Sequence, residues 1–454
     1  MTPPSGRVAV RRVEGARYDD ARVAAAVRAA IADVGLDAPN AHSDGWNPFG
    51  ELVRRGGTVL VLPNFVFHKR PSEDAARFEA KCTQAAALRP LVELARRAVG
   101  TDGLVRVGNA PVQSGAWEAV LADTGTRAML DALDRDGARV EAVDLRGWVL
   151  DRDLRGSARA EGVSVDLGSA SLLDALGGAD TFRVTHYDPA RTGRFHGPGR
   201  HVYRLARAAL EADLIVSAPK LKTHNKVGAT LSLKGCVGTI AEKDCLAHHR
   251  RGDARRGGDE YPRANPLLAL RTALGERVWR EGEAGRATLL GRRLDMALSF
   301  VAHRAGMATG GSWSGNDTCW RMALDIARCL RFADREGALC EAPQRAHVAL
   351  IDGVVGGDGD GPLAPSPVRS GCVVFSANPF AADAAGASVM GFDPRRLNIV
   401  AGAVGLARYP VTALRFEDLA ASLDGAPVAL DALAGRVSPR FNAAGGWRGA
   451  IEAR

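Results

Sequence analysis

Five basic side chains follow one apolar segment within fifteen residues of the sequence. The segment ADLIVSAPK ends at Lys220, and Lys222, His224, Lys226 and Lys234 follow among Gly, Thr and Ser residues. Small residues let backbone N–H groups approach an anion, and lysine ammonium groups neutralise its charge. The P-loop pattern Gly-x-x-x-x-Gly-Lys-Ser/Thr is absent from the sequence. We therefore predict a phosphate or carboxylate site, although a solvated basic loop explains Lys220 and Lys226 equally well.

A pair of adjacent histidines follows in the stretch AEKDCLAHHRRGDARRGGDEYP. His248 and His249 lie between Lys243 and the acidic residues Asp259 and Glu260. Imidazole is the usual general base and a common metal ligand near neutral pH. The spacing is not that of a Cys/His zinc site. The prediction of His248 and His249 as metal ligands therefore rests on residue type, and two surface histidines without a chemical role are the alternative.

A glycine-rich acidic loop, DGVVGGDGDGPLAPSP, carries Asp352, Asp358 and Asp360. Such loops bind divalent cations when carboxylates converge, but the EF-hand pattern fails because no Glu stands at its twelfth place. Asp-Gly pairs are also ordinary turn formers. Both interpretations stay open at this point.

Strand-like and helix-like segments alternate along most of the chain. Apolar runs typical of buried strands occupy residues 58–65, 104–109, 139–145, 213–220, 347–357 and 370–379. Helical patterns lie between them at 72–99, 116–133, 201–211 and 380–391, and a further strand is expected at 397–403. This alternation predicts an α/β fold with mostly parallel sheets covered by helices on both faces.

Shifts in composition divide the chain into four expected regions. Residues 1–50 are polar and punctuated by Gly and Pro, which predicts an N-terminal adapter segment. The alternating pattern predicts a larger α/β domain with the Lys/His site over 51–262 and a smaller α/β domain over 335–454. Between them, residues 263–334 are rich in Arg and Leu and are predicted as a helical insertion.

Ligands of parallel sheets bind beyond the carboxyl ends of the strands, so polar residues at these ends are candidates. Asn316 and Asp317 precede a helical pattern as expected caps, with Arg321 in its first turn. The catalytic candidates are His224, Lys234 and Lys222. The predicted substrate- or cofactor-binding residues are Asn64, Gln113, Lys220, Thr223, Thr230, Lys243, Asp259, Asn316, Asp317, Arg321 and Asp352.

The amino-acid composition limits the classes of partner that we expect for this chain. The formal net charge is +8, but no block of like charges and no nucleic-acid-binding motif occurs, so a small anionic metabolite is expected rather than nucleic acid. No apolar run approaches the length that spans a membrane, and the start has no signal-peptide core, so no membrane partner is expected. Association of the chain into a homo-oligomer stays an open alternative.

The seven cysteines are odd in number and contain no Cys-x-x-Cys pair. This usage is typical of reduced thiols and predicts a cytoplasmic protein. It also argues against a built-in ferredoxin-type iron–sulfur cluster, which needs closely spaced thiolates.

Seven blocks of the sequence resemble, in order, those of the domain family of unknown function numbered 362. They are VLPNFVFHK, GNAPVQSGAW, APKLKTHNKVGATLSLKGCVG, EKDCLAHHRRGDARRGGDEYP, GSWSGNDTCWRMALD, LIDGVVGGDGDGPLAP and ANPFAADAAGASVMGFDP. The resemblance spans roughly residues 55 to 400, and some members of that family are fused to iron–sulfur modules. It names a family without a reaction.

The stretch ALEADLIVSAPKLKTHNKVGATLSLKGCVG is also distantly similar to the nickel-pincer lactate racemases. His224 and Lys234 keep their His-x9-Lys spacing. This resemblance implies a two-lobe architecture, an acid/base role for His224, a cofactor or substrate anchor in Lys234, and a metal ligand in His248 or His249. The second catalytic His of those racemases has no counterpart in VGNAPVQ, so simple two-base racemisation is not expected.

We therefore expect an enzyme that acts on a small carboxylate or phosphate by acid/base or redox chemistry in a cleft between two lobes. An isomerase or oxidoreductase, with a biosynthetic role, is the leading expectation, and its cofactor is either a divalent metal or a nickel-pincer-like group. A metal- or phosphate-dependent transferase or ligase that uses Asp358 and Asp360 is one alternative. A non-enzymatic metal or iron–sulfur handling protein is the other, in which Cys236, Cys245 and Cys319 meet in space.

Overall fold

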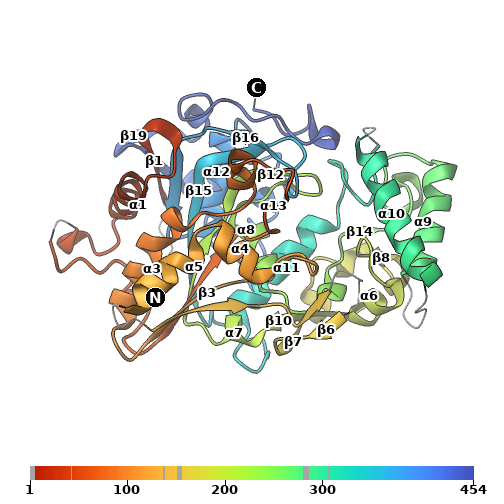
Figure 1. Cartoon of the computed structure of the whole chain (residues 1–454), viewed down its shortest axis with the longest axis horizontal. Coiled ribbons are helices and arrows are strands. Elements are labelled where there is room, and N and C mark those ends of the chain that lie inside the picture. The colour runs from red at the N-terminus through yellow and green to blue at the C-terminus, as the bar shows by residue number, and fades with distance from the viewer. Residues whose placement is uncertain are drawn as a thin grey trace.

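The computed structural model describes residues 6–41, 43–135, 139–150, 156–279, 286–304 and 307–453. Parts of the predicted adapter segment, at 1–5 and 42, and of the predicted helical insertion, at 280–285 and 305–306, lie outside the described residues. The described residues form an α/β structure around one large mixed sheet of twelve strands (Figure 1).

The centre of this sheet consists of parallel strands. β4 (Val140–Asp144), β3 (Leu104–Asn109), β2 (Thr58–Pro63), β11 (Leu214–Ala218) and β15 (Ala346–Asp358) lie in this order, and each pair of neighbours is parallel. Continuous runs of Val, Leu and Ile suit these positions because both faces of a parallel sheet are covered. β11 and nearly all of β15 are buried accordingly. The mostly parallel sheet predicted from the sequence is confirmed.

The sheet continues beyond β15 into strands of mixed direction. β17 (Cys372–Ser376) pairs with β15 and with β1 (Arg7–Arg12), and β18 (Ala420–Leu423) and β19 (Ala426–Val428) complete that side. Strands from the predicted adapter segment and from both predicted α/β domains therefore share one sheet. The expected two-lobe arrangement is not confirmed.

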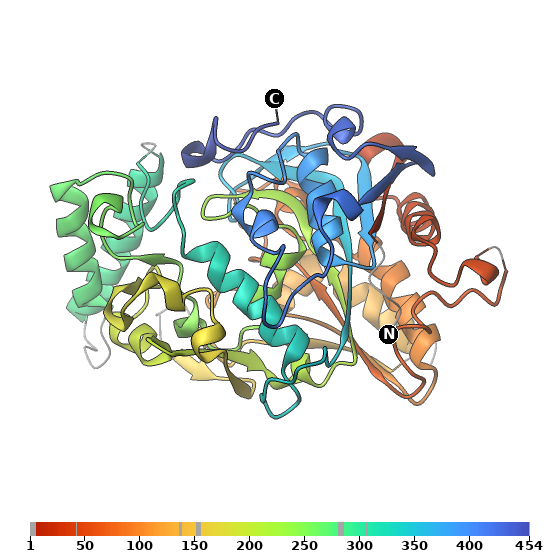
Figure 2. The same cartoon turned by 180° about the vertical axis from the view of Figure 1, so that it is seen from behind.

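Helices cover both faces of the sheet (Figures 1 and 2). One layer contains α1 (Asp20–Val34), α3 (Ala85–Val99) and α5 (Thr126–Arg135), whose apolar side chains share a core with β2 and β3. The opposite layer contains α8 (Leu231–Gly235), α11 (Cys319–Phe332), α12 (Pro379–Val389) and α13 (Asn398–Ala401). Of these, α12 contacts β15 and β17 directly. The shorter α2 (Ala75–Lys81) and α4 (Trp117–Asp123) lie near the carboxyl ends of the strands.

Two predicted elements are wrong. The segment predicted as a helix at 201–211 forms β10 (Arg200–Ala206) and then one short turn, α7 (Arg207–Leu210). β10 pairs with β7 (Gly162–Asp166) and β9 (His196–Gly197), and this pairing outweighs local propensity. The segment predicted as a strand at 397–403 forms α13 instead, because short apolar runs do not distinguish a buried strand from a buried helix.

A smaller subdomain extends from one end of the sheet. It contains the hairpin β5 (Trp148–Leu150) and β6 (Gly156–Ala158), the strands β8 (Phe182–Arg183) and β14 (His249–Arg250), and α6 (Pro189–Phe195). Two helices, α9 (Pro266–Val278) and α10 (Arg286–Arg304), pack side by side there and form the far end of the molecule (Figures 1 and 2). Of residues 263–334, predicted as helical, the segments α9, α10 and α11 are helices, whereas residues 307–318 form a loop. Among the residues that the structure describes, we find no helix with the length and apolarity required to span a bilayer.

Candidate functional site

The basic stretch forms a buried strand, a tight turn and a short helix. β11 passes through Pro219 into β12 (Lys220–His224), which lies beside the end of β15. The chain then turns back through β13 (Gly228–Ala229) into α8. All five residues of β12 are buried. For Lys220, the alternative of a solvated basic loop is therefore wrong.

Lys220 is held by partners within the protein. Its Nζ lies 2.9 Å from Asp352 Oδ2, and both side chains are fully buried. Tyr18 from the N-terminal segment donates to Asp352 Oδ1 at 2.8 Å and accepts a hydrogen bond from Lys220. Burial lowers the pKa of Lys220, and the Asp352 carboxylate opposes this shift. Lys220 and Asp352, both predicted to bind a ligand, thus compensate each other.

Lys222 and Thr223 anchor the loop that follows β15. Lys222 Nζ donates to the carbonyl oxygen of Lys81 at 2.6 Å, and Thr223 Oγ1 donates to that of Gly359 at 3.0 Å. Burial lowers the pKa of Lys222 to about 7. Both side chains therefore hold backbone segments together. Neither of them lines the cavity described next.

A cavity of about 750 Å³ opens where β12 ends. His224 and Lys226 contribute from β12 and its turn, and His248 and His249 contribute from the start of β14. The remaining walls come from the turn after β8, the loop after β15, and the inner faces of α9 and α10. Two stretches that are more than twenty residues apart in the sequence are therefore brought together, as predicted for a site of several basic groups.

Burial favours the neutral form of three histidines that line the cavity, His224, His248 and His249. Burial lowers the pKa of His224, His248 and His249 well below its ordinary value, and nearby lysine charges lower it further. His224 Nδ1 accepts from the backbone N–H of Lys226 at 3.1 Å, which leaves the ring proton on Nε2. The Nδ1 atoms of His248 and His249 are buried and have no hydrogen-bond partner among the described residues. Buried polar atoms usually have a partner, so these two lack a group that the cavity can supply.

Two lysines lie close to these imidazoles. Lys226 Nζ donates to the carbonyl oxygen of Gly310 and to Thr185 Oγ1, and burial lowers its pKa to about 8. Lys234 on α8 is half-buried, and its ammonium has neither an ion pair nor a hydrogen bond to any described residue. Its charge lowers the pKa of both His224 and His248, which places it close to these rings. Lys234 is therefore a cation without an ion pair among the described residues, beside the neutral imidazoles of His224 and His248.

Three acidic residues that line the cavity are bonded to other side chains, although Glu260 still raises the pKa of Lys226. Glu260 accepts from Thr272 Oγ1 at 2.5 Å, and Glu276 pairs with Arg183 at 2.5 Å. Asp295 pairs with Arg271 at 3.2 Å. The field at the histidines therefore remains positive.

Asp383 positions Lys234, and the sequence analysis missed it. Its carboxylate on α12 accepts from the backbone N–H groups of Ser232 at 2.7 Å and Leu233 at 2.9 Å. These are the first N–H groups of α8, which a helix cannot satisfy internally. Asp383 thus fixes the short helix that carries Lys234. The available signal was one acidic residue in the otherwise apolar helical segment FAADAAGASVMG.

The lysine content carries a further signal that the sequence analysis did not use. The chain has 60 Lys and Arg residues, but only seven are lysines: Lys69, Lys81, Lys220, Lys222, Lys226, Lys234 and Lys243. Of these, Lys69 alone is exposed. Surface charge is supplied by arginine, so the remaining lysines mark the interior around the cavity. Lys81, absent from the predicted set, is fully buried and pairs with Glu73 at 2.5 Å.

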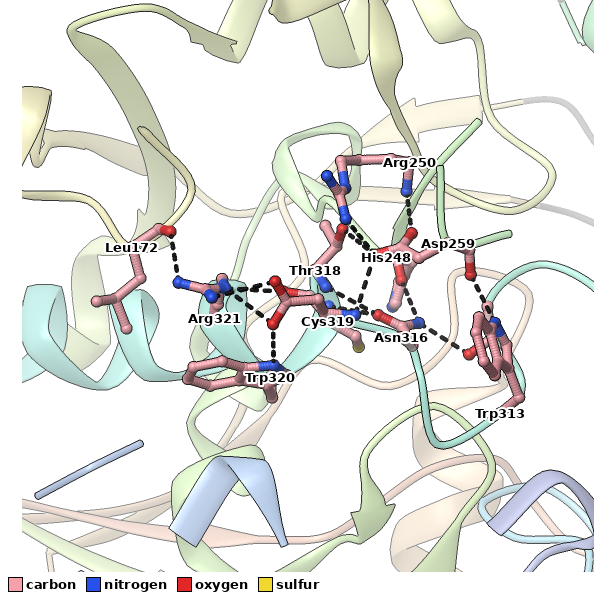
Figure 3. Close-up of polar contacts among 12 residues, drawn as sticks. Leu172, His248, Arg250, Asp259, Trp313, Asn316, Thr318, Cys319, Trp320 and Arg321 are labelled. Atoms are coloured by element: carbon pink, nitrogen blue, oxygen red, sulfur yellow. Dashed lines mark hydrogen bonds and ion pairs between the residues drawn. The ribbon is translucent and has the colours of Figure 1, made fainter. Parts of the chain in front are cut away.

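Asp259 joins the loop before α11 to the histidine segment (Figure 3). Its Oδ1 accepts from the backbone N–H of Arg250, and its Oδ2 accepts from Thr318 Oγ1 at 2.6 Å and from the N–H of Asp317 at 3.0 Å. Trp313 Nε1 donates to the Asp259 carbonyl oxygen at 2.9 Å. All of these partners belong to the protein, so Asp259 fixes the wall of the cavity instead of facing into it.

Asn316 makes a second connection in the same network (Figure 3). Its Oδ1 accepts from the N–H groups of Thr318 and Cys319, and its Nδ2 donates to the His248 carbonyl oxygen at 2.9 Å. The N-cap of α11 is Thr318, so the prediction of Asn316 and Asp317 as its caps is wrong by one or two residues. Arg321 lies outside the cavity, where it pairs with Asp317 at 3.1 Å. Asn316 therefore holds the backbone of His248 in place.

The Asp259 network gives a first testable prediction. We expect Asp259→Ala to lower the free energy of unfolding by about 2–4 kcal/mol, because four donors or charges lose a buried acceptor. Urea unfolding checks this value. Asp317→Ala is the matched control, because its exposed pair with Arg321 contributes under about 1 kcal/mol. An Asp259→Ala protein as stable as the control would contradict a supporting role.

The other predicted residues lie near the cavity but not in its wall. Asn64 Oδ1 and Thr230 Oγ1 are buried without a partner in the part of the chain that the structure describes. Lys243 Nζ donates to the Ala110 carbonyl oxygen at 2.8 Å, and the backbone oxygen of buried Gln113 accepts from Arg146. Of the predicted catalytic, binding and metal-ligating residues, His224, His248 and His249 line the cavity, as do Asp358 and Asp360 of the transferase alternative.

The described residues contain no group of three His, Cys, Asp or Glu side chains that could together hold a metal ion. Ligation of a metal by His248 or His249 therefore stays a prediction, and any such metal would need ligands from a cofactor or substrate. All seven cysteines carry free thiols.

Comparison with known proteins gives one positive finding. A family model described as "Domain of unknown function (DUF362)" matches residues 148–388, which is more than half of the chain. No curated protein and no solved structure matches the sequence or the fold. The matched region includes β12, α8, the cavity residues His224, His248 and His249, and the Asp259 network. The chain therefore belongs to the domain family of unknown function DUF362.

Proposed function

We propose that the protein is an enzyme that acts on a small anionic metabolite, a carboxylate or a phosphate, by acid/base or redox chemistry in the 750 Å³ cavity. One observation supports this above all others. Neutral His224, His248 and His249 meet Lys226 and Lys234, and Lys234 has neither an ion pair nor a hydrogen bond to any described residue. Burying a cation without a counter-charge lowers the stability of a protein, so a ligand that supplies negative charge explains the presence of Lys234.

The arrangement suits proton transfer next to an acidic group. Lys226 and Lys234 would hold the substrate anion and stabilise charge that develops on its oxygens. Neutral His224 carries its proton on Nε2 and would donate a hydrogen bond from it to a substrate oxygen, while the neutral rings of His248 and His249 each keep one unprotonated nitrogen that can act as a base. The bound anion would raise the pKa of these imidazoles toward neutrality, so that substrate binding itself activates them. An isomerase or an oxidoreductase fits this set of groups best.

A cofactor is compatible with the same residues. The ammonium of Lys234 and the unpartnered Nδ1 atom of His248 fit an anionic organic cofactor or its metal, and these two residues would hold it. Such a group would accept and return hydride when bound. Elemental analysis and a visible spectrum of purified protein test this point, because a metal-free and colourless protein would remove the cofactor from the proposal.

A transferase or ligase is the second candidate, because Asp358 and Asp360 line the same cavity. Asp358 Oδ2 already accepts from the backbone and side-chain N–H groups of Asn442, at 3.0 and 2.7 Å. A divalent ion would therefore have to share this carboxylate. Within the described residues, no comparable feature favours a non-enzymatic metal or iron–sulfur handling protein.

Thermal shift measurements with a panel of carboxylates and phosphates test the proposed function. We expect at least one anion to raise the melting temperature of the natural chain, and His224→Asn, which keeps a hydrogen-bond acceptor for Lys226, to abolish turnover of that anion. Lys69→Met is the control, because Lys69 is exposed outside the cavity. If no anion shifts the melting temperature, or if His224→Asn turns the substrate over normally, the proposal is wrong.

The titration of Lys226 determines how the affinity for the anion should change with pH. The pKa of Lys226 in the free protein is about 8 and a bound anion raises it, so affinity is highest below pH 8 and falls as pH rises above it. The stability of the free protein should change in the opposite sense, because deprotonation above pH 8 removes a buried charge. Calorimetric titrations from pH 7 to pH 9.5 check the first trend, with a fall of up to roughly tenfold per pH unit for one proton. Lys226→Arg should remove this dependence, because arginine keeps its proton.

A further inference from the structure

The outer face of the α9/α10 helix pair carries an exposed apolar surface. Its residues, which we call the hairpin seam, are Leu267, Leu270, Leu274, Leu290, Leu294, Leu298 and Val301. Between 46% and 75% of each of these side chains is exposed. Single exposed apolar residues are ordinary, but seven on two neighbouring helices exceed what a typical monomer shows.

Both rows of the hairpin seam lie on one side of the helix pair. Along α9 the row repeats at intervals of three and four residues and covers roughly 60° of the helix. The residues of α9 that face α10 are others, because Arg271 and Trp279 bond to Asp295 at 3.2 and 3.0 Å. Leu290 and Leu294 likewise turn away from the Asp295 side of α10. The inner faces line the cavity, so the polar sides of both helices are already occupied.

We propose that the hairpin seam is the interface with a second copy of this chain, in which two helix pairs stack as a four-helix bundle. A narrow row at three- and four-residue spacing is the pattern of helices that pack on other helices. The seven side chains expose on the order of 800 Å², which is what one partner contributes to a stable interface.

The charges around the seam agree with this occupant. Glu276 pairs with Arg183, and Asp295 pairs with Arg271, so neither acid lies in the seam. Arg277 is exposed at its edge, where a polar rim is expected and where like charges on two copies repel weakly in water. Helices that lie on a membrane instead turn a strongly basic face to water, whereas the polar faces of α9 and α10 turn into the protein.

Sedimentation velocity of the full chain over a range of protein concentrations tests the interface. We expect the natural chain to form dimers and Leu270→Glu/Leu294→Glu to sediment as a monomer, because the symmetry places both changes twice in one interface. Val112→Glu is the matched control, since Val112 is 40% exposed in a loop remote in sequence from the hairpin. Circular dichroism verifies the fold of each variant.

Three outcomes would overturn the proposal: a natural chain that stays monomeric, a dimer that persists in the double variant, or a control that also dissociates. If the natural chain is monomeric but floats with anionic vesicles through the same leucines, the seam binds lipid instead. If the glutamate variant fails to fold, Leu270→Ala/Leu294→Ala decides, because it retains helix propensity. We expect this milder pair to weaken dimerisation at least tenfold, and an unchanged dissociation constant would refute the interface.

Discussion

Lys234→Met should weaken anion binding roughly a hundredfold while leaving the free protein as stable as the natural chain, or more stable. The ammonium of Lys234 is half-buried and has no partner among the described residues, and burial lowers its pKa. An apolar side chain of similar length removes that desolvation cost. The same change removes a charge-assisted contact to the ligand, which is worth about 3 kcal/mol or roughly a hundredfold in affinity. Opposite effects on stability and on binding are the mark of a residue kept for function.

Calorimetry with the anion that shifts the melting temperature measures the affinity, and urea unfolding measures the stability. Lys69→Met is again the matched control, because it removes one lysine charge from the surface and should change neither quantity. A large loss of stability in Lys234→Met would show that Lys234 supports the fold. Unchanged affinity would show that the anion binds elsewhere.

The positions of the strands could be predicted well from the sequence. Residues 104–109 were predicted as a strand and form β3 without any shift, because a run of apolar residues between turn signals has few other solutions. It could not be predicted that all of these strands belong to one sheet. β1 is a short strand near the N-terminus, and only its pairing with β17, more than 360 residues away, places it in the sheet. Such pairing depends on the whole chain, not on local pattern.

The site was predicted in part, for a physical reason. Residue type and spacing indicated that His224, Lys234 and the two later histidines gather, and the structure brings three of these four into the wall of one cavity and the fourth beside it. Sequence could not distinguish polar groups that await a ligand from those that bond to the protein. Asp259 and Asp352 have the residue types of binding groups, yet their carboxylates bond to groups of this chain. Asp383 was missed because its role is to hold backbone N–H groups.

The buried pair of Lys220 and Asp352 has the largest expected effect on stability. Both side chains are fully buried, and Tyr18 and the backbone of Gln84 also donate to the Asp352 carboxylate. Asp352→Asn keeps the shape of the side chain but leaves Lys220 without its counter-charge. Removing one partner of such a pair costs about 3–5 kcal/mol, which urea unfolding would measure as a lower free energy of unfolding. Lys220→Met alone leaves the carboxylate unpaired, and we expect a loss of similar size.

The double variant Lys220→Met/Asp352→Asn separates a structural pair from a binding group. With both charges removed, no unpaired ion remains, so most of the lost stability should return, and the double-mutant cycle should show strong coupling. Anion affinity should equal that of the natural chain, because neither residue lines the cavity. If Asp352 instead contacted the substrate or its metal, binding would stay impaired after stability returned. The two measurements on one variant therefore decide whether this aspartate belongs to the fold or to the site, which residue type and spacing alone left open.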